Sequence, residues 1–135
     1  MNIWKYYDGD LKYPDLIKHT EEKEIAKTNP KWAYEYLYTN TNDKSGELEL
    51  IIAKNAKYSY RYAKIILKDK FSLGEPAIAK DSYYSYAYAK NILEAPFKLG
   101  EPEIAKDEYY SKRYTQEVLK KYFYLDGKLI CKYKG

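Results

Sequence analysis

The residues from Leu73 to Lys90 read LGEPAIAKDSYYSYAYAK, and those from Leu99 to Gln116 read LGEPEIAKDEYYSKRYTQ. The two stretches begin 26 residues apart and share Gly-Glu-Pro, Ile-Ala-Lys, an aspartate and a tyrosine-rich segment in the same order. Self-similarity at a fixed period of roughly 20 to 50 residues is typical of repeat architectures. These two stretches therefore predict a repeat protein and set its period.

The period extends through most of the 135-residue chain. Residues with a capping side chain recur every 26 positions, as Asn29, Asn55, Asp81 and Asp107. Two further columns are aromatic: Tyr36, Tyr62, Tyr88 and Tyr114, then Phe71, Phe97 and Phe123. We predict a single domain over residues 1–135, with an N-terminal cap at 1–22, repeats over 23–119, and a partial repeat and C-terminal cap at 120–135.

Each unit is predicted to contain one long and one short helix. Asn and Asp are preferred N-cap residues, so each of these four capping residues marks the start of a long helix, such as Ser82–Glu94. Pro76 and Pro102 suit the first turn of a second helix that carries Ile-Ala-Lys. Neighbouring units must stack, because no unit can bury its own apolar stripe. The predicted fold is all-α: a small right-handed helical-repeat solenoid of about four 26-residue, two-helix units.

The segment Leu73–Lys90, with Ile92, Leu93 and Phe97 after it, resembles tandem repeats in tailed-bacteriophage proteins of unassigned function. Their pattern is GEPAIAKD followed by YAYxYAK and a GRF step, and the resemblance covers residues 22–132. This chain departs at the last step, where it has Asp69-Lys70-Phe71 and Ala95-Pro96-Phe97. The resemblance implies a viral origin and an all-helical array that acts in the cytoplasm of an infected bacterium. It implies no catalytic residues.

The composition argues against several classes of protein. The chain has no apolar run long enough for a secretory signal or a membrane span, so we expect a soluble, intracellular protein. One cysteine and one histidine leave no Cys/His zinc cluster and little scope for nucleophilic catalysis. Cys131 stands in an alanine column, and we interpret it as a small buried packing residue. We expect His19 at the surface, no enzymatic activity, no metal and no cofactor.

One face of the long helices is the candidate binding surface. Three columns lie opposite the predicted buried stripe: Lys31, Lys57, Tyr83 and Tyr109; Tyr34, Tyr60, Tyr86 and Lys112; Tyr38, Lys64, Lys90 and Gln116. Tyrosine offers a large amphipathic contact area and is enriched at interaction hot spots. We predict that the contact residues are Tyr34, Tyr60, Tyr83, Tyr86, Tyr109, Lys64 and Lys90. The alternative interpretation is that the tyrosines pack between helices and the lysines form an ordinary solvated face.

The charge pattern bears on the kind of partner. The formal net charge is +4, and the 24 basic residues include only two arginines, Arg61 and Arg113. Because bidentate recognition of phosphate or guanine prefers arginine, a protein partner is favoured. We predict stoichiometric binding to a host protein, as in inhibition of a bacterial defence protein. Nucleic acid is the second hypothesis, since aromatic rings among lysines can stack bases. Capture of a nucleotide signal is a third hypothesis, and membrane binding is not expected.

Overall fold

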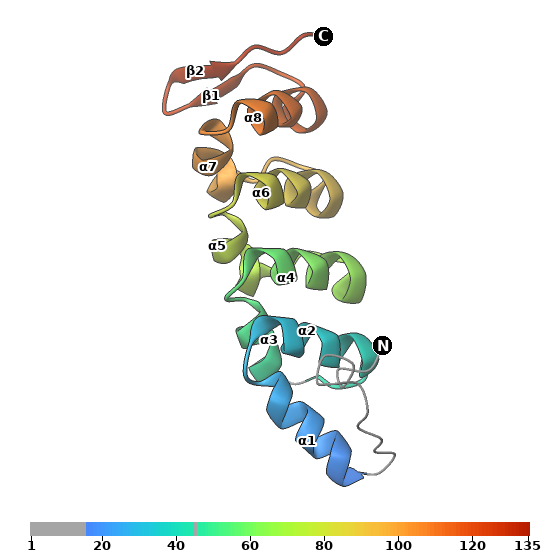
Figure 1. Ribbon diagram of the computed structural model, residues 1–135. Helices are drawn as coiled ribbons and strands as arrows, with labels where there is room; N and C mark the ends of the chain where they lie inside the picture. The colour runs from blue at the N-terminus through green and yellow to red at the C-terminus, as the bar shows by residue number, and fades with distance from the viewer. Residues whose placement is uncertain (1–15, 45) are drawn as a thin grey trace.

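The computed structural model describes residues 16–44 and 46–135, with side chains from Glu21 onward. The described part is mostly helical, as predicted (Figure 1). Its α-helices are α1 (Leu16–Ala26), α2 (Pro30–Thr39), α3 (Gly46–Ile52), α4 (Ala56–Arg61), α5 (Glu75–Ile78), α6 (Ser82–Tyr88), α7 (Glu101–Ala105) and α8 (Glu108–Tyr114). Most of the predicted N-terminal cap and the side chain of His19 lie outside the described residues.

The four capping residues precede the long helices, as predicted. Each Asn or Asp side chain accepts a hydrogen bond from the backbone N–H three residues later, over 2.8–3.0 Å in all four units. The Asn29 side chain caps α2, where Pro30 occupies the first turn, and Asp81 caps α6 in the same way. These bonds satisfy an N–H group that has no partner inside the helix.

The last turn of three long helices is a π-helix. α4 continues through Tyr62–Leu67, α6 through Ala89–Leu93, and α8 through Thr115–Leu119. Each π turn ends at a residue in the left-handed region: Lys68, Glu94 or Lys120, with φ between 51° and 55°. The helix predicted over Ser82–Glu94 therefore has the expected extent, and its final turn is wider than an α-helix.

A close backbone approach fixes the return to the short helix. Ser72–Gly74 and Lys98–Gly100 form 3₁₀ turns that lead directly into α5 and α7. A β-carbon at Gly74 would lie 2.5 Å from the Ser59 hydroxyl oxygen, so only glycine fits against α4 there. That hydroxyl in turn donates to the Ile52 carbonyl over 3.0 Å. The contacts of Gly74 with Ser59 and of Gly100 with Ser85 therefore hold α4 and α6 against the short helices that follow them.

Buried tyrosines link successive units through hydrogen bonds. The Tyr88 hydroxyl donates to the Glu75 carboxylate over 2.6 Å and accepts from the Phe71 backbone N–H over 2.9 Å. The Tyr114 hydroxyl makes the equivalent bonds one unit later. A phenylalanine meets each of these tyrosines edge-on, in the pairs Tyr62–Phe71, Tyr88–Phe97 and Tyr114–Phe123. The two aromatic columns of the sequence thus form the centre of the core.

The long helices lie one above another in Figure 1, and α3, α5 and α7 follow one side of that ladder. α4 packs against α2 and α6, and α6 packs against α8. The short helix α5 contacts both α4 and α6, and α7 contacts both α6 and α8. Each short helix therefore bridges two successive long helices.

Residues 120–135, predicted as a partial repeat and C-terminal cap of an all-α fold, contain a β-hairpin instead of a further pair of helices. β1 (Phe123–Leu125) pairs antiparallel with β2 (Lys128–Cys131) and packs on the last helices. Asp126 and Gly127 both have positive φ, as a type I′ turn requires. Lys128 replaces the proline that begins α5 and α7, which removes the local signal for a short helix. Cys131 is half-buried, less than we predicted.

Candidate interaction face on the long helices

The structure divides the predicted contact residues into two groups. Tyr34, Tyr60 and Tyr86 are only 6%, 6% and 4% exposed, so the prediction that they lie on an open face is wrong. Each of these rings packs against an aromatic ring of the next long helix: Tyr34 on Tyr58, Tyr60 on Tyr84, and Tyr86 on Tyr110, with centroids 5.6–5.8 Å apart. The three tyrosines of this column therefore form a buried aromatic layer beneath the exposed residues of the face.

Tyr83 and Tyr109 remain at the surface, 41% and 59% exposed. Their rings pack edge-on against the adjacent Tyr84 and Tyr110, at 4.9 Å between centroids. Tyr83 also contacts Tyr110 on the next helix. Both rings are consequently held in place on one side and open to solvent on the other.

Lys64 and Lys90 are exposed, as predicted. The Lys64 ammonium lies 5.8 Å from the centre of the Tyr60 ring, and Lys90 lies 5.9 Å from that of Tyr86. Such cation–π contacts each contribute roughly 0.5–1 kcal/mol at exposed sites. The structure therefore brings these two lysines together with the buried tyrosines beneath them.

Glu117 is the centre of a charged cluster on this face. Its carboxylate accepts hydrogen bonds from the Tyr86 hydroxyl, the Lys90 ammonium and the Arg113 guanidinium over 2.5–2.8 Å. The Arg113 guanidinium, followed by Lys90 and Tyr86, lowers the pKa of the Glu117 carboxyl to about 2. Arg113 also donates to the Tyr109 hydroxyl over 3.1 Å. The cluster joins α6 and α8, and a single carboxylate forms ion pairs with two cations.

A second group of cations on the same face has no such counterion. Lys57, Arg61, Lys64 and Lys68 are spaced by four, three and four residues, which places them on one side of the helix that begins with α4. We call these four residues the α4 stripe. Residues 56–68 contain no Asp or Glu, and no ion pair among the described residues includes a member of the stripe.

The contacts of the α4 stripe are aromatic. Lys57 and Arg61 lie over the Tyr58 ring at 5.4 and 5.9 Å from its centre, and Lys64 lies over Tyr60. Our sequence reasoning singled out Lys64 but missed Arg61 and Lys68. The helical spacing of four cations with no acid between them is the signal that identifies the whole stripe.

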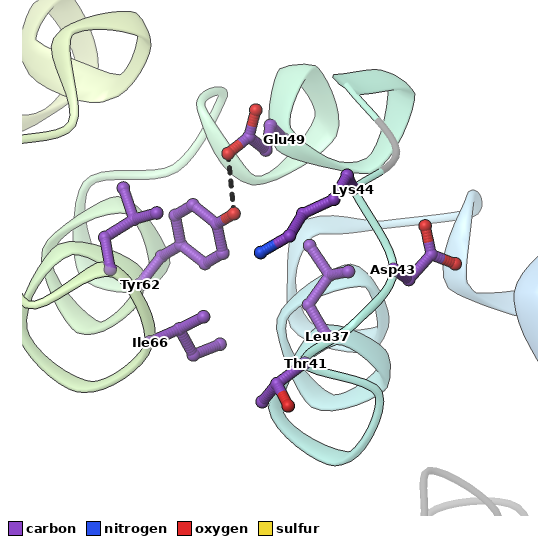
Figure 2. Close-up of a pocket in the computed structure, with 8 residues that line it drawn as sticks. Leu37, Thr41, Asp43, Lys44, Glu49, Tyr62 and Ile66 are labelled. Atoms are coloured by element: carbon purple, nitrogen blue, oxygen red, sulfur yellow. Dashed lines mark hydrogen bonds between the residues drawn. The ribbon is translucent and has the colours of Figure 1, made fainter.

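A small cavity of about 200 Å³ lies between the loop after α2 and the helix that begins with α4 (Figure 2). The Tyr62 hydroxyl donates to the Glu49 carboxylate over 2.6 Å at one wall, and the Lys44 side chain extends between Tyr62 and Leu37. The cavity lies where residues 39–45 depart from the repeat pattern. It is smaller than typical small-molecule sites of roughly 300–1,000 Å³. Glu49 is already paired with Tyr62, so this cavity offers little to a ligand.

Among the described residues, no group of three or more His, Cys, Asp or Glu side chains is placed to hold a metal ion. None of the helices in the described ranges has the length and apolarity needed to cross a membrane. No protein-family model, no curated protein and no solved structure matches this sequence. The arrangement on the long helices, with exposed rings and unpaired cations on a packed aromatic layer, is suited to binding rather than to bond-making chemistry.

Proposed function

We propose that this chain is a right-handed helical-repeat solenoid that binds another protein, and that it acts in the bacterial cytoplasm as a phage inhibitor of a host protein. The stacking of α2, α4, α6 and α8 supports the solenoid, because successive units share one core. The phage resemblance of the repeat supports the setting. The single observation that carries the binding function is the outward face of α4, α6 and α8.

That face combines the features of an interaction hot spot. Tyr83 and Tyr109 expose large rings, and each ring is already fixed by a neighbouring tyrosine. Rigid aromatic side chains lose little conformational entropy when they bind, which favours affinity. Arg113 donates to the Tyr109 hydroxyl, and the exposed cations Arg61 and Lys64 provide charge recognition on the same face.

Binding of nucleic acid is the second candidate function, and the acid-free α4 stripe is the observation that favours it. The burial of Tyr34, Tyr60 and Tyr86 weighs against it, because bases need open ring faces on which to stack. Lysine also outnumbers arginine on the stripe, whereas bidentate phosphate recognition prefers arginine. A protein partner is therefore the better-supported proposal.

The experiment is capture of partners from bacterial lysate by the tagged full-length chain, with and without nuclease. The test variant combines Tyr83→Ala with Tyr109→Ala. The matched control is Tyr122→Ala, which removes another exposed tyrosine, 46% exposed, outside the long helices. We expect one host protein in stoichiometric amount, insensitive to nuclease, retained by the control and lost from the test variant.

Two results would refute the proposed function. One is capture that disappears on nuclease treatment, which would assign the face to nucleic acid. The other is equal capture by the test variant and the wild type, which would show that this face is not the binding surface. Circular dichroism melts of all variants provide the folding control: loss of the ring contacts of Tyr83 and Tyr109, roughly 0.5–1.5 kcal/mol for each pair, should lower the melting temperature and leave the variants folded at the assay temperature.

A further inference from the structure

The Glu117 cluster shows how this surface binds a carboxylate. Three donors converge on one carboxyl group: the hydroxyl of Tyr86, the ammonium of Lys90 and the guanidinium of Arg113. Charge-assisted hydrogen bonds of this kind are shorter and roughly twice as strong as neutral ones. The long-helix face is therefore chemically suited to carboxylates.

One unit earlier, two of these three donors recur without a carboxylate, and Ala87 stands at the position of Arg113. Tyr60 and Lys64 occupy the positions of Tyr86 and Lys90, but Asn91 stands where Glu117 would be. The Asn91 side-chain amide donates to the Tyr60 hydroxyl oxygen over 2.8 Å. Among the described residues, no hydrogen bond gives the Tyr60 proton or the Lys64 ammonium an acceptor. This end of the α4 stripe is consequently a cluster of donors.

The rest of the stripe extends this donor-only surface along the helix. Arg61, Lys64 and Lys68 are exposed, and Lys57 is half-exposed. Two acids close to the stripe, Asp69 in the sequence and Glu35 on a neighbouring helix, form no ion pair with it. Asp69 accepts from the Lys70 backbone N–H over 2.7 Å, and Glu35 on the neighbouring helix α2 is buried. No side chain of the described chain therefore neutralises the stripe.

The dimensions of the stripe suit a short peptide. Lys68 follows Lys57 by eleven residues, which is at most roughly 16 Å along the axis, because the π turn over Tyr62–Leu67 rises less per residue than an α-helix. An extended chain covers that length in about five residues at roughly 3.3 Å each. Alternate side chains of such a strand repeat about every 6.6 Å, close to the rise of about 4.5–6 Å between successive cations of the stripe. A run of acidic residues can thus present several carboxylates to it at once.

We propose that the α4 stripe binds an Asp/Glu-rich segment of the partner protein, with its carboxylates received by Arg61, Lys64 and the Tyr60–Asn91 pair. This inference rests on the proposed function and names the chemistry of the partner. Carboxylate is favoured over nucleic acid because the same face already binds one at Glu117, and because Tyr60 is too buried to stack a base. Tyr58 in turn is covered by Lys57 and Arg61.

The test measures fluorescence anisotropy of a labelled oligo-glutamate peptide titrated with the full-length chain, beside oligo-dT of equal length. The test variant is Arg61→Glu with Lys64→Glu. The matched control is Lys128→Glu with Lys132→Glu, which changes the charge equally on the C-terminal hairpin, at the far end of the ladder from α4 (Figure 1). We expect salt-sensitive peptide binding that weakens about tenfold or more in the test variant and by less than about threefold in the control.

Three outcomes would overturn the inference: no binding of the peptide, equal weakening in the test and control variants, or tighter binding of oligo-dT with the same loss. Arg61→Gln with Lys64→Gln gives the same direction of effect if the charge reversal impairs folding. The Arg61→Glu, Lys64→Glu variant is also compared with the Tyr83→Ala, Tyr109→Ala variant in the lysate capture. If the first still captures the host protein and the second does not, this inference alone is overturned. The proposed function would then stand.

Discussion

Removing one buried hydroxyl tests whether the tyrosine–carboxylate bonds hold the units together. Tyr114→Phe keeps the ring packing and deletes only the hydroxyl, which donates to Glu101 over 2.6 Å and accepts from the Phe97 N–H over 3.0 Å. Tyr114 is 0% exposed and Glu101 is 3% exposed, so water cannot readily replace either bond. A hydrogen bond to a charged group contributes about 1.5–3 kcal/mol, and a buried donor left unpaired costs about 1–3 kcal/mol. We expect the free energy of unfolding to fall by about 3–5 kcal/mol.

The assay is urea unfolding followed by circular dichroism, with the midpoint compared at constant m-value. Tyr122→Phe is the matched control, since that ring is 46% exposed and its hydroxyl makes no hydrogen bond within the described residues. The control should change the free energy of unfolding by less than about 0.5 kcal/mol. A loss below about 1 kcal/mol in Tyr114→Phe would refute the view that these bonds stabilise the stack.

Three further predictions concern pH and packing. Burial raises the pKa of the Tyr36, Tyr62, Tyr88 and Tyr114 phenols above the ordinary 10.0, so the folded chain keeps these protons after the unfolded chain loses them. The contribution of these phenols to stability should be constant below about pH 10 and fall above it by about 1.4 kcal/mol per pH unit for each phenol. Helical circular dichroism that is unchanged at pH 12 would contradict this prediction. Arg113 and Lys90 lower the pKa of Glu117 from 4.5 to about 2, so its stabilisation is present above about pH 4.5 and lost as the pH falls to 2. Glu117→Gln should lower the free energy of unfolding by about 1 kcal/mol at pH 7, after allowance for solvent screening, and by almost nothing at pH 2. Equal losses at both pH values would show that the Glu117 charge does not stabilise the fold. Gly100→Ala should lower the free energy of unfolding by about 2–3 kcal/mol in thermal melts, because its β-carbon would collide with Ser85 and Phe97. The control Gly46→Ala should be nearly neutral, since the space around Gly46 is open. Equal effects of the two substitutions would contradict the close approach at Gly100.

Local signals in the sequence predicted the helices well. The caps at Asn55, Asp81 and Asp107 act within three residues of their own position, so the residue type is enough to place a helix start. Pro76 likewise marks the short helix through a local backbone requirement, whereas Gly74 is required by the approach of Ser59 from α4. A type I′ turn is equally local, and the Asp126-Gly127 pair could have identified the hairpin had the repeat period not been extended over it.

The candidate site was harder to predict, because the next unit decides which side chains of a long helix are exposed to solvent. Tyr60 meets Asn91 and Tyr86 meets Glu117, in both cases 31 residues later, although the repeat period is 26. The Tyr60 and Tyr86 rings also pack on Tyr84 and Tyr110, 24 residues later, so the next long helix covers tyrosines that a helical wheel of one helix leaves open. Lys64 and Lys90, one turn further along, remain exposed.

The sequence by itself determined the period, the helix starts, the helical class and the buried Tyr88 and Phe97 columns, because hydrogen-bonding and turn preferences act over a few residues. Only the tertiary structure decided which of the surface columns face solvent. Burial of these columns is set by the stacking of successive long helices, a relation between residues 24 to 31 positions apart. The same stacking pairs Glu117 with Lys90, whereas Asn91 at the equivalent position of the preceding unit leaves Lys64 without a carboxylate.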